Sequence, residues 1–129
     1  MILIDTSAWV EFLRDTGSAV CERVDALLGE ETATCHPIRM ELLAGALNEP
    51  HLRDLRGLLA RGTLIPTEPT DYEDGAALYR SCRRRGDTVR KLMDCLIAAT
   101  AIRAAVPILH ADTDFDVLAR HTPLMVERP

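Results

Sequence analysis

The strongest constraint on the fold of this chain is the alternation of four short strand-like runs with helical patterns. The first run, Ile2-Leu3-Ile4, is continuously apolar, as expected for a strand buried on both faces. Similar runs lie at residues 32–35, 63–65 and 106–109, and residues 124–126 form a possible fifth strand at an edge. This alternation predicts an α/β/α sandwich on a mainly parallel sheet of four to five strands.

Helical spacing of apolar residues fills the intervals between these runs. The sequence predicts a helix that starts after a cap at Thr6 or Ser7, and a second one from about residue 18 to 28. Further helices are expected after Pro37, after Pro50, over about 70–85 and around 115–118. Residues 92–102 are apolar nearly all round, which predicts a central, buried helix.

Length and composition favour one folded domain that spans residues 1–129. The hydrophobic fraction of 47% excludes wholesale disorder, and 129 residues are enough for one core. No apolar run approaches the ~20 residues of a membrane span, and Asp5 interrupts the N-terminal run too early for a secretory signal. The four cysteines form no C-x-x-C pair, so we expect no structural zinc and a cytoplasmic protein with reduced thiols.

Acidic residues follow the first and the fourth predicted strands. Asp5 comes directly after the first, and Asp112 and Asp114 come after the fourth. Ligands of open parallel sheets bind beyond the carboxyl ends of the strands, which makes these acids candidates for a site. Each also has a structural alternative: Asp5 suits a helix cap, and Asp112 and Asp114 suit the positive end of the last helix.

Two further acids interrupt apolar helical stretches. Glu41 lies in Met-Glu-Leu-Leu, and Asp94 lies in Leu-Met-Asp-Cys-Leu-Ile. A carboxylate in apolar surroundings costs several kcal/mol unless it is paired or binds a metal. Glu41 could instead face solvent, and Asp94 could form a buried ion pair with Arg90 or Arg103.

Taken together, these five acids predict one acidic pocket that requires cations. Carboxylates gathered in one place repel one another, and an all-oxygen ligand set suits Mg²⁺ or Mn²⁺ rather than zinc. Such pockets commonly serve phosphoryl transfer or phosphodiester hydrolysis, in which the metal activates a water and neutralises charge on the phosphate. The chain has no P-loop, no G-x-G-x-x-G, no G-x-S-x-G and no H-E-x-x-H motif. We expect His110 to be a strand-end histidine rather than a general base.

A basic strip precedes the helix that carries Asp94. Six of the twelve residues from Arg80 to Lys91 are basic, and Asp87 is the one acid among them. Such a run is often only a solvated helix surface. Beside an acidic metal pocket it suits a polyanion, with Arg90 and Lys91 nearest the mouth. With few aromatic residues, the chain is not expected to read bases by stacking.

Four motifs in register resemble those of the PIN-domain ribonucleases, and of the VapC-type toxins in particular. They are the segments 2–9, 41–45, 94–99 and 110–116, in an order and at a spacing that extend the match over essentially the whole chain, and residues 83–90 resemble a stretch of one VapC subgroup. The resemblance implies a PIN-like three-layer α/β/α sandwich and an endoribonuclease dependent on Mg²⁺ or Mn²⁺. It also implies a homodimer, a cognate VapB-type antitoxin that covers the site, and a higher toxin–antitoxin complex.

The resemblance assigns roles residue by residue. Asp5, Glu41, Asp94 and Asp112 match the family's four metal-binding and catalytic acids, and Asp114 matches a fifth acid found in part of the family. Thr6 and Ser7 would orient these acids as hydrogen-bonding neighbours. The candidate RNA-binding residues of the basic strip are Arg83, Arg84, Arg85, Arg90 and Lys91.

The resulting hypothesis is a metal-dependent endoribonuclease whose hydrolysis leaves a 5′-phosphate and a 3′-hydroxyl. The alternatives are a PIN-like module that binds RNA or protein without cutting and, less favoured, a small phosphatase. Large apolar residues over 9–13 and 50–60 exceed what one small domain buries easily, so we expect part of that surface to meet another chain.

The net charge of −5 does not argue against a polyanionic substrate, although it first suggests this. The five candidate acids account for the whole excess, and the remaining 15 acids equal the 15 basic residues. The excess negative charge is therefore interpreted as a metal pocket rather than an acidic surface.

Overall fold

A parallel four-stranded sheet organises the computed structural model, which describes residues 1–129. The strands are β1 (Ile2–Ile4), β2 (Thr32–Cys35), β3 (Thr63–Ile65) and β4 (Ile108–Leu109), in the spatial order β3-β2-β1-β4. Leu3 pairs with Ala33 on one side and with Ile108 on the other. The four strands and the parallel pairing predicted from the apolar runs are confirmed.

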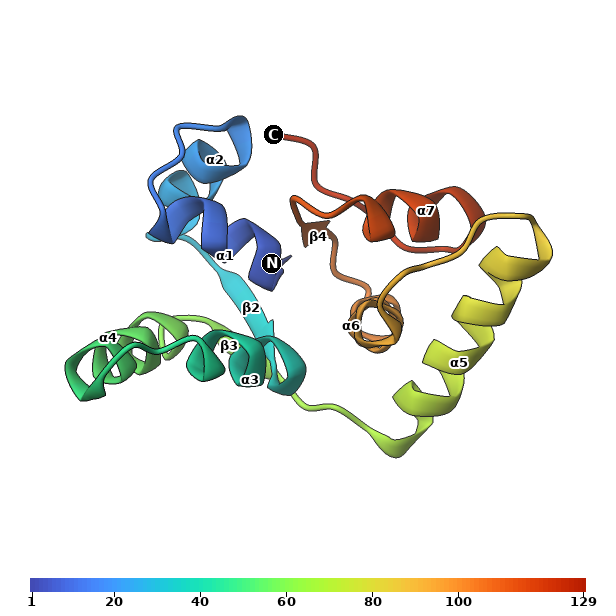
Figure 1. The fold of residues 1–129 in the computed structure, drawn as a ribbon, viewed down its shortest axis with the longest axis horizontal. Helices are drawn as coiled ribbons and strands as arrows, with labels where there is room; N and C mark the ends of the chain where they lie inside the picture. Colours follow the sequence, from blue (N-terminus) through green and yellow to red (C-terminus); the bar gives the residue numbers. More distant parts are fainter.

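Seven helices connect and cover these strands in a three-layer arrangement (Figure 1). The steps from β1 to β2 and from β2 to β3 run in one direction, and the step from β3 to β4 runs back across the sheet. Right-handed crossovers therefore place the first four helices on one face and the next two on the other. The helices are α1 (Thr6–Leu13), α2 (Ala19–Leu27), α3 (His36–Ala44), α4 (Glu49–Leu59), α5 (Pro69–Arg84), α6 (Leu92–Ala104) and α7 (Thr113–His121).

The direction of strand order reverses beside β1, and this brings distant parts of the chain together. β1 and β4 are neighbours, with Ile4 paired to Leu109. Their carboxyl ends therefore lie side by side, and the segments that follow them start from the same edge of the sheet. This is the crevice in which open α/β sheets bind ligands.

The fifth strand expected at residues 124–126 is reduced to a single parallel bridge between Ile108 and Val126. The Ile108 N–H donates to the Met125 carbonyl at 3.0 Å, and the pairing extends no further than Glu127. Because β4 itself has only two residues, it offers an added strand almost no ladder to join.

Helix α6 is the central buried helix that its apolar sequence predicts. Every residue from Asp94 to Ala101 is buried, and α5 packs closely along it. Gly75 makes this approach possible, because a Cβ at that position would lie 3.2 Å from the backbone nitrogen of Leu96. The backbones of α5 and α6 are therefore in close contact at Gly75.

A buried ion pair also joins α5 to α6. Asp71 is completely buried and accepts from the Arg103 guanidinium at 2.8 and 3.0 Å, and from the Thr100 hydroxyl at 3.2 Å. The alternative in which Arg103 pairs with Asp94 is therefore wrong. Arg103 lies more than two helical turns beyond Asp94, at the end of α6 that faces the start of α5.

The surface around α1 and α4 is only partly apolar in the folded chain. Trp9, Leu55 and Leu59 are buried, whereas Leu13 is 43% exposed and Leu47, between α3 and α4, is 86% exposed. Leu13 and Leu47 line one hollow between these helices. None of the helices combines the length and the apolar character that crossing a bilayer requires.

Candidate metal centre

Asp5 uses its two carboxylate oxygens for different purposes. Oδ2 caps α1, because it accepts from the Ser7 N–H at 2.9 Å and from the Ser7 hydroxyl at 2.6 Å. Oδ1 is buried and has no hydrogen-bond partner. The helix cap is therefore Asp5, not Thr6 or Ser7 as the sequence suggested. The capping alternative for Asp5 is correct, and it leaves one oxygen free.

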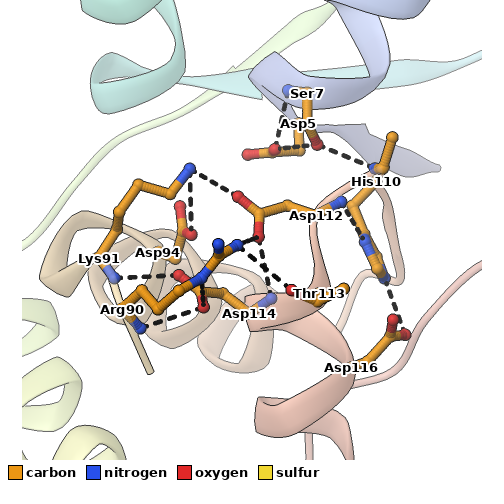
Figure 2. Close-up of polar contacts among 11 residues, drawn as sticks. Asp5, Ser7, Arg90, Lys91, Asp94, His110, Asp112, Thr113, Asp114 and Asp116 are labelled. Carbon is orange, nitrogen blue, oxygen red and sulfur yellow. Dashed lines mark hydrogen bonds and ion pairs between the residues drawn. The ribbon is translucent and has the colours of Figure 1, made fainter. Parts of the chain in front are cut away.

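Asp112 repeats this arrangement at the end of β4. Its Oδ1 caps α7 by accepting from the Asp114 N–H at 2.9 Å. Its Oδ2 lies 2.5 Å from Lys91 Nζ. The Ser7 hydroxyl ties the two strand ends together, because it also accepts from the Ala111 N–H at 2.9 Å (Figure 2).

Asp94 projects from the first turn of α6 toward the same place. Its Oδ2 is buried without a hydrogen-bond partner, and its one ion pair is a 3.7 Å contact with Lys91 Nζ. Neither Arg90 nor Arg103 pairs with it, so the structural alternative proposed from sequence is wrong. No basic side chain within hydrogen-bond distance therefore balances the burial of Asp94.

Asp114 is buried and holds the segment that leads into α6. Its two oxygens accept from the backbone N–H groups of Arg90 at 3.1 Å and Lys91 at 3.0 Å. Asp94, Asp112 and Asp114 can each bring one oxygen within 4.8 Å of the others. Asp114 therefore lies beside the cluster while both of its oxygens already accept hydrogen bonds.

Glu41 reaches the cluster from α3 and is half-buried rather than facing solvent. It accepts from the Thr6 hydroxyl at 2.8 Å. A pocket of about 390 Å³ is lined by Asp5, Glu41 and Asp94 together with Thr6, Ser7, Lys91 and Glu11. The structure thus brings the acids of three separate segments into one hollow.

Glu11 is a pocket residue that the sequence analysis missed. It lies four positions after Ser7 on α1, and this spacing places the two side chains on the same helix face. The signal was therefore available in the sequence.

The basic strip divides into two parts. Arg83 to Arg85 end α5 as exposed side chains that do not line the pocket, and Arg83 lies over the Tyr79 ring. Arg90 and Lys91 reach the acids, as expected. There they pair with carboxylates, because the Arg90 guanidinium contacts Asp112 at 3.2 Å and Asp114 at 3.3 Å.

Burial raises the pKa of two of the clustered acids. Desolvation raises the pKa of Asp5 to about 6, although the hydrogen bonds from Ser7 oppose this. Desolvation, a hydrogen bond with Asp114 and the charge of Asp5 raise the pKa of Asp94 to about 8. Near neutral pH, Asp94 therefore retains a proton unless a cation takes its place, whereas Asp5 is largely ionised.

The pKa values of Asp112 and Asp114, which face the basic residues, are lowered instead. Burial acts to raise the pKa of Asp112 and Asp114, but hydrogen bonds outweigh it and both pKa values fall. For Asp112 the main opposing donor is Lys91, and for Asp114 it is the backbone N–H of Arg90. The negative charge of the metal-free pocket is thus concentrated on the side where Arg90 and Lys91 lie.

Two further acids, Asp87 and Asp116, form ion pairs outside the pocket. Asp87 is half-buried and pairs with His121 at 2.6 Å and with Arg120 at 3.0 Å. Asp116 lies 3.5 Å from His110 Nε2. The other ring nitrogen of His110 accepts from the Asp112 N–H at 3.1 Å, and burial lowers the pKa of this histidine. His110 lies at the strand end, as expected, and supports the backbone there.

The donor set fits a hard divalent cation. The acidic ligands in the pocket are all carboxylates, with no thiol or imidazole among its lining residues, and two of their oxygens, on Asp5 and Asp94, are buried without a partner. Buried polar atoms are nearly always satisfied, so two unsatisfied oxygens on residues that line one pocket fit a cation site. Oxygen-only coordination favours Mg²⁺ or Mn²⁺.

Comparison with known proteins identifies related sequences and folds. The family model of the PIN domain matches residues 2–121. Ribonuclease VapC11 of Mycobacterium tuberculosis is 49% identical over 128 residues, which is 96% of each chain. An identity and a coverage this high, together with the match to the family model, establish that the chain and this relative belong to one family.

Two solved structures share the fold. A toxin-antitoxin complex from Klebsiella pneumoniae contains a chain with a TM-score of 0.71 at 22% identity, and the match covers 89% of this chain and 90% of that one. VapBC-1 from nontypeable Haemophilus influenzae gives a TM-score of 0.75 at 18% identity over 98% and 97% of the two chains. At these identities the likeness establishes the architecture.

Proposed function

The chain belongs to the PIN domain family and, within it, to the VapC-type proteins, and we propose that it is the toxin endoribonuclease of a VapBC-type toxin–antitoxin pair. We treat residues 1–129 as one PIN domain. The observation that carries the proposal is the pair of buried, unpartnered oxygens on Asp5 and Asp94 in a pocket that four carboxylates line. A module that binds without cutting has no need to maintain such a costly arrangement.

We assign the metal to Asp5, Glu41, Asp94 and Asp112, with Asp114 as a supporting acid. A bound Mg²⁺ or Mn²⁺ would lower the pKa of an attacking water and neutralise charge on the phosphate. The free oxygens of Asp5 and Asp94 are the ones available to hold it. Asp114, whose oxygens hold the backbone of Arg90 and Lys91, would position the start of α6 and therefore Asp94.

The hydrogen-bonding neighbours keep these oxygens in place. Ser7 holds Asp5 and the backbone after β4 with one hydroxyl, so it fixes the spacing of the two strand ends. Thr6 holds Glu41, whose carboxylate would accept a proton from, or orient, the water that attacks the phosphate. Such outer partners commonly contribute 10- to 100-fold in metal affinity or activity.

The proposed substrate is RNA, and the protein would cleave it in the cytoplasm. Arg83, Arg84 and Arg85 are exposed beside the segment that leads to the pocket, where they can contact flanking phosphates. Hydrolysis would leave a 5′-phosphate and a 3′-hydroxyl, because water attacks the phosphorus and the 3′ oxygen departs.

The proposed partners are a VapB-type antitoxin and a second copy of the chain. The support is the structural likeness to toxin–antitoxin complexes and the apolar surface around Leu13 and Leu47. A contact that buries this surface would remove large apolar side chains from water.

The test is cleavage of structured RNA by the purified protein. We expect cleavage with Mg²⁺ or Mn²⁺, none in excess EDTA, and loss of cleavage in Asp94→Asn. Asp25→Asn serves as a matched control, because Asp25 is an exposed acid that forms no ion pair. Cleavage by Asp94→Asn at the wild-type rate would show that the assignment is wrong.

A further inference from the structure

We propose that Lys91 is a built-in counter-ion of the metal-free pocket, and that a divalent cation must displace it to bind. The inference rests on the proposed metal site and adds to it a residue that competes with the metal. Lys91 lies directly before α6, and its ammonium group is drawn between two of the acids (Figure 2).

The geometry places the ammonium group beside two of the acids that would ligate the metal. Nζ lies 2.5 Å from Asp112 Oδ2 and 3.7 Å from Asp94 Oδ2. The second of these oxygens has no hydrogen-bond partner at all. Lys91 also lines the pocket together with Asp5 and Glu41. One monovalent cation therefore contacts two of the candidate ligands.

Arg90 cannot take the same role, although it is the neighbouring residue. Its guanidinium contacts Asp112 Oδ1, the oxygen that also caps α7, and it does not line the pocket. Lys91 instead contacts Oδ2 of Asp112, which carries no other hydrogen bond in the structure. The two basic residues thus serve opposite sides of one carboxylate.

Lys91 and a divalent ion cannot share these oxygens. A divalent ion on Asp94 and Asp112 would lie within a few ångströms of Nζ, and like charges at such a separation repel strongly. The lysine is also the residue able to leave, because its side chain is 54% exposed and has a flexible four-carbon stem. Its backbone stays fixed, since the Lys91 N–H donates to Asp114 at 3.0 Å.

Displacement would leave Lys91 at the mouth of the pocket with its charge unpaired. There it is placed to contact a non-bridging oxygen of the bound phosphate. The same side chain therefore balances the charge of Asp112 in the metal-free state and adds positive charge at the rim of the pocket when metal is bound.

The chain itself provides a direct test, because Lys91 is its only lysine. An amine-acylating reagent can label only Lys91 and the α-amino group, and mass spectrometry of the two peptides separates them. We expect Mn²⁺ to accelerate labelling of Lys91 severalfold while the α-amino group, as internal reference, keeps its rate. An unchanged or slower rate at Lys91 in the presence of bound Mn²⁺ would overturn the proposal.

Calorimetric titration of Mn²⁺ provides the second measurement. Removing the competing charge in Lys91→Met should tighten Mn²⁺ binding by about tenfold or more, whereas Lys91→Arg should not. Arg53→Gln, which removes an exposed positive charge on α4, should bind like the wild type. Equal or weaker binding by Lys91→Met argues against a counter-ion. Absence of binding by every variant would instead refute the metal site and the proposed function.

Discussion

The energetic cost of Asp94 gives the sharpest prediction for the metal-free protein. Its pKa is about 8 in the folded chain against an ordinary value of 3.8, so the folded state retains a proton that the unfolded state releases. Stability contributed by this group is present at low pH and is lost as the pH rises from about 4 toward 8.

The magnitude follows from the distance between these two values. Each tenfold step in proton activity is worth ~1.4 kcal/mol, and about three such steps separate the ordinary pKa from pH 7, so the group costs about 4 kcal/mol there. Asp94→Asn replaces the protonated carboxyl with a neutral amide of similar shape. The variant should therefore equal the wild type near pH 4 and exceed its unfolding free energy by up to about 4 kcal/mol at pH 7.

Urea unfolding in EDTA at pH 4.5, 6 and 7.5 measures this difference directly. Thermal unfolding should show the same trend, with a rise in Tm on the order of 10 °C at the highest pH. Added Mn²⁺ should reverse the order, because it stabilises only the protein that retains its ligands. Asp25→Asn should show no pH-dependent gain. A difference for Asp94→Asn that stays constant across the three pH values would refute the reasoning.

Three further predictions concern the framework around the pocket. Arg103→Ala leaves Asp71 charged and buried without its partner, so we expect urea unfolding to show a free energy of unfolding lower by about 3–5 kcal/mol. A decrease below about 1 kcal/mol would contradict this, because it would mean that water hydrates Asp71 in the variant. Ser7→Ala removes the hydroxyl that contacts both Asp5 Oδ2 and the Ala111 N–H, while the backbone N–H of residue 7 still caps α1, so RNA cleavage should fall by about 10- to 100-fold with little loss of stability; wild-type cleavage would contradict this. Gly75→Ala forces α5 away from α6 and should cost about 1–3 kcal/mol, measured by thermal unfolding; an unchanged Tm would show that the helices separate freely.

The sequence predicts the fold and the members of the pocket because both depend on patterns local to the chain. Buried strands reveal themselves as short apolar runs, and an acid such as Asp94 is conspicuous among apolar neighbours. Both features can be recognised from neighbouring residues alone, without knowledge of the tertiary contacts. The reduced edge strand at Val126 was overestimated, since pattern alone does not indicate how short its partner β4 is.

The pairing of charges could not be predicted, because it depends on distances between helices. The sequence offered Asp94 the partners Arg90 and Arg103, whereas the structure gives it Lys91 and gives Arg103 to Asp71. In the same way, the division of labour between the two oxygens of Asp5 is a matter of side-chain orientation. The sequence motifs identify the acids of the pocket, and the three-dimensional structure shows which oxygen of each acid has no hydrogen-bond partner.

The adjacency of β1 and β4 determines when in its synthesis the chain can become active. Ser7 and Ala111, which one hydrogen bond joins at the pocket, are 104 positions apart in the sequence. Translation at about 5–20 residues per second needs roughly 5 to 20 s to cover that interval, and during this time Asp5 has no neighbouring strand end to complete the pocket. A nascent copy therefore cannot assemble the proposed pocket until Ala111 has been made. Any partner that must silence the finished protein has that interval in which to arrive.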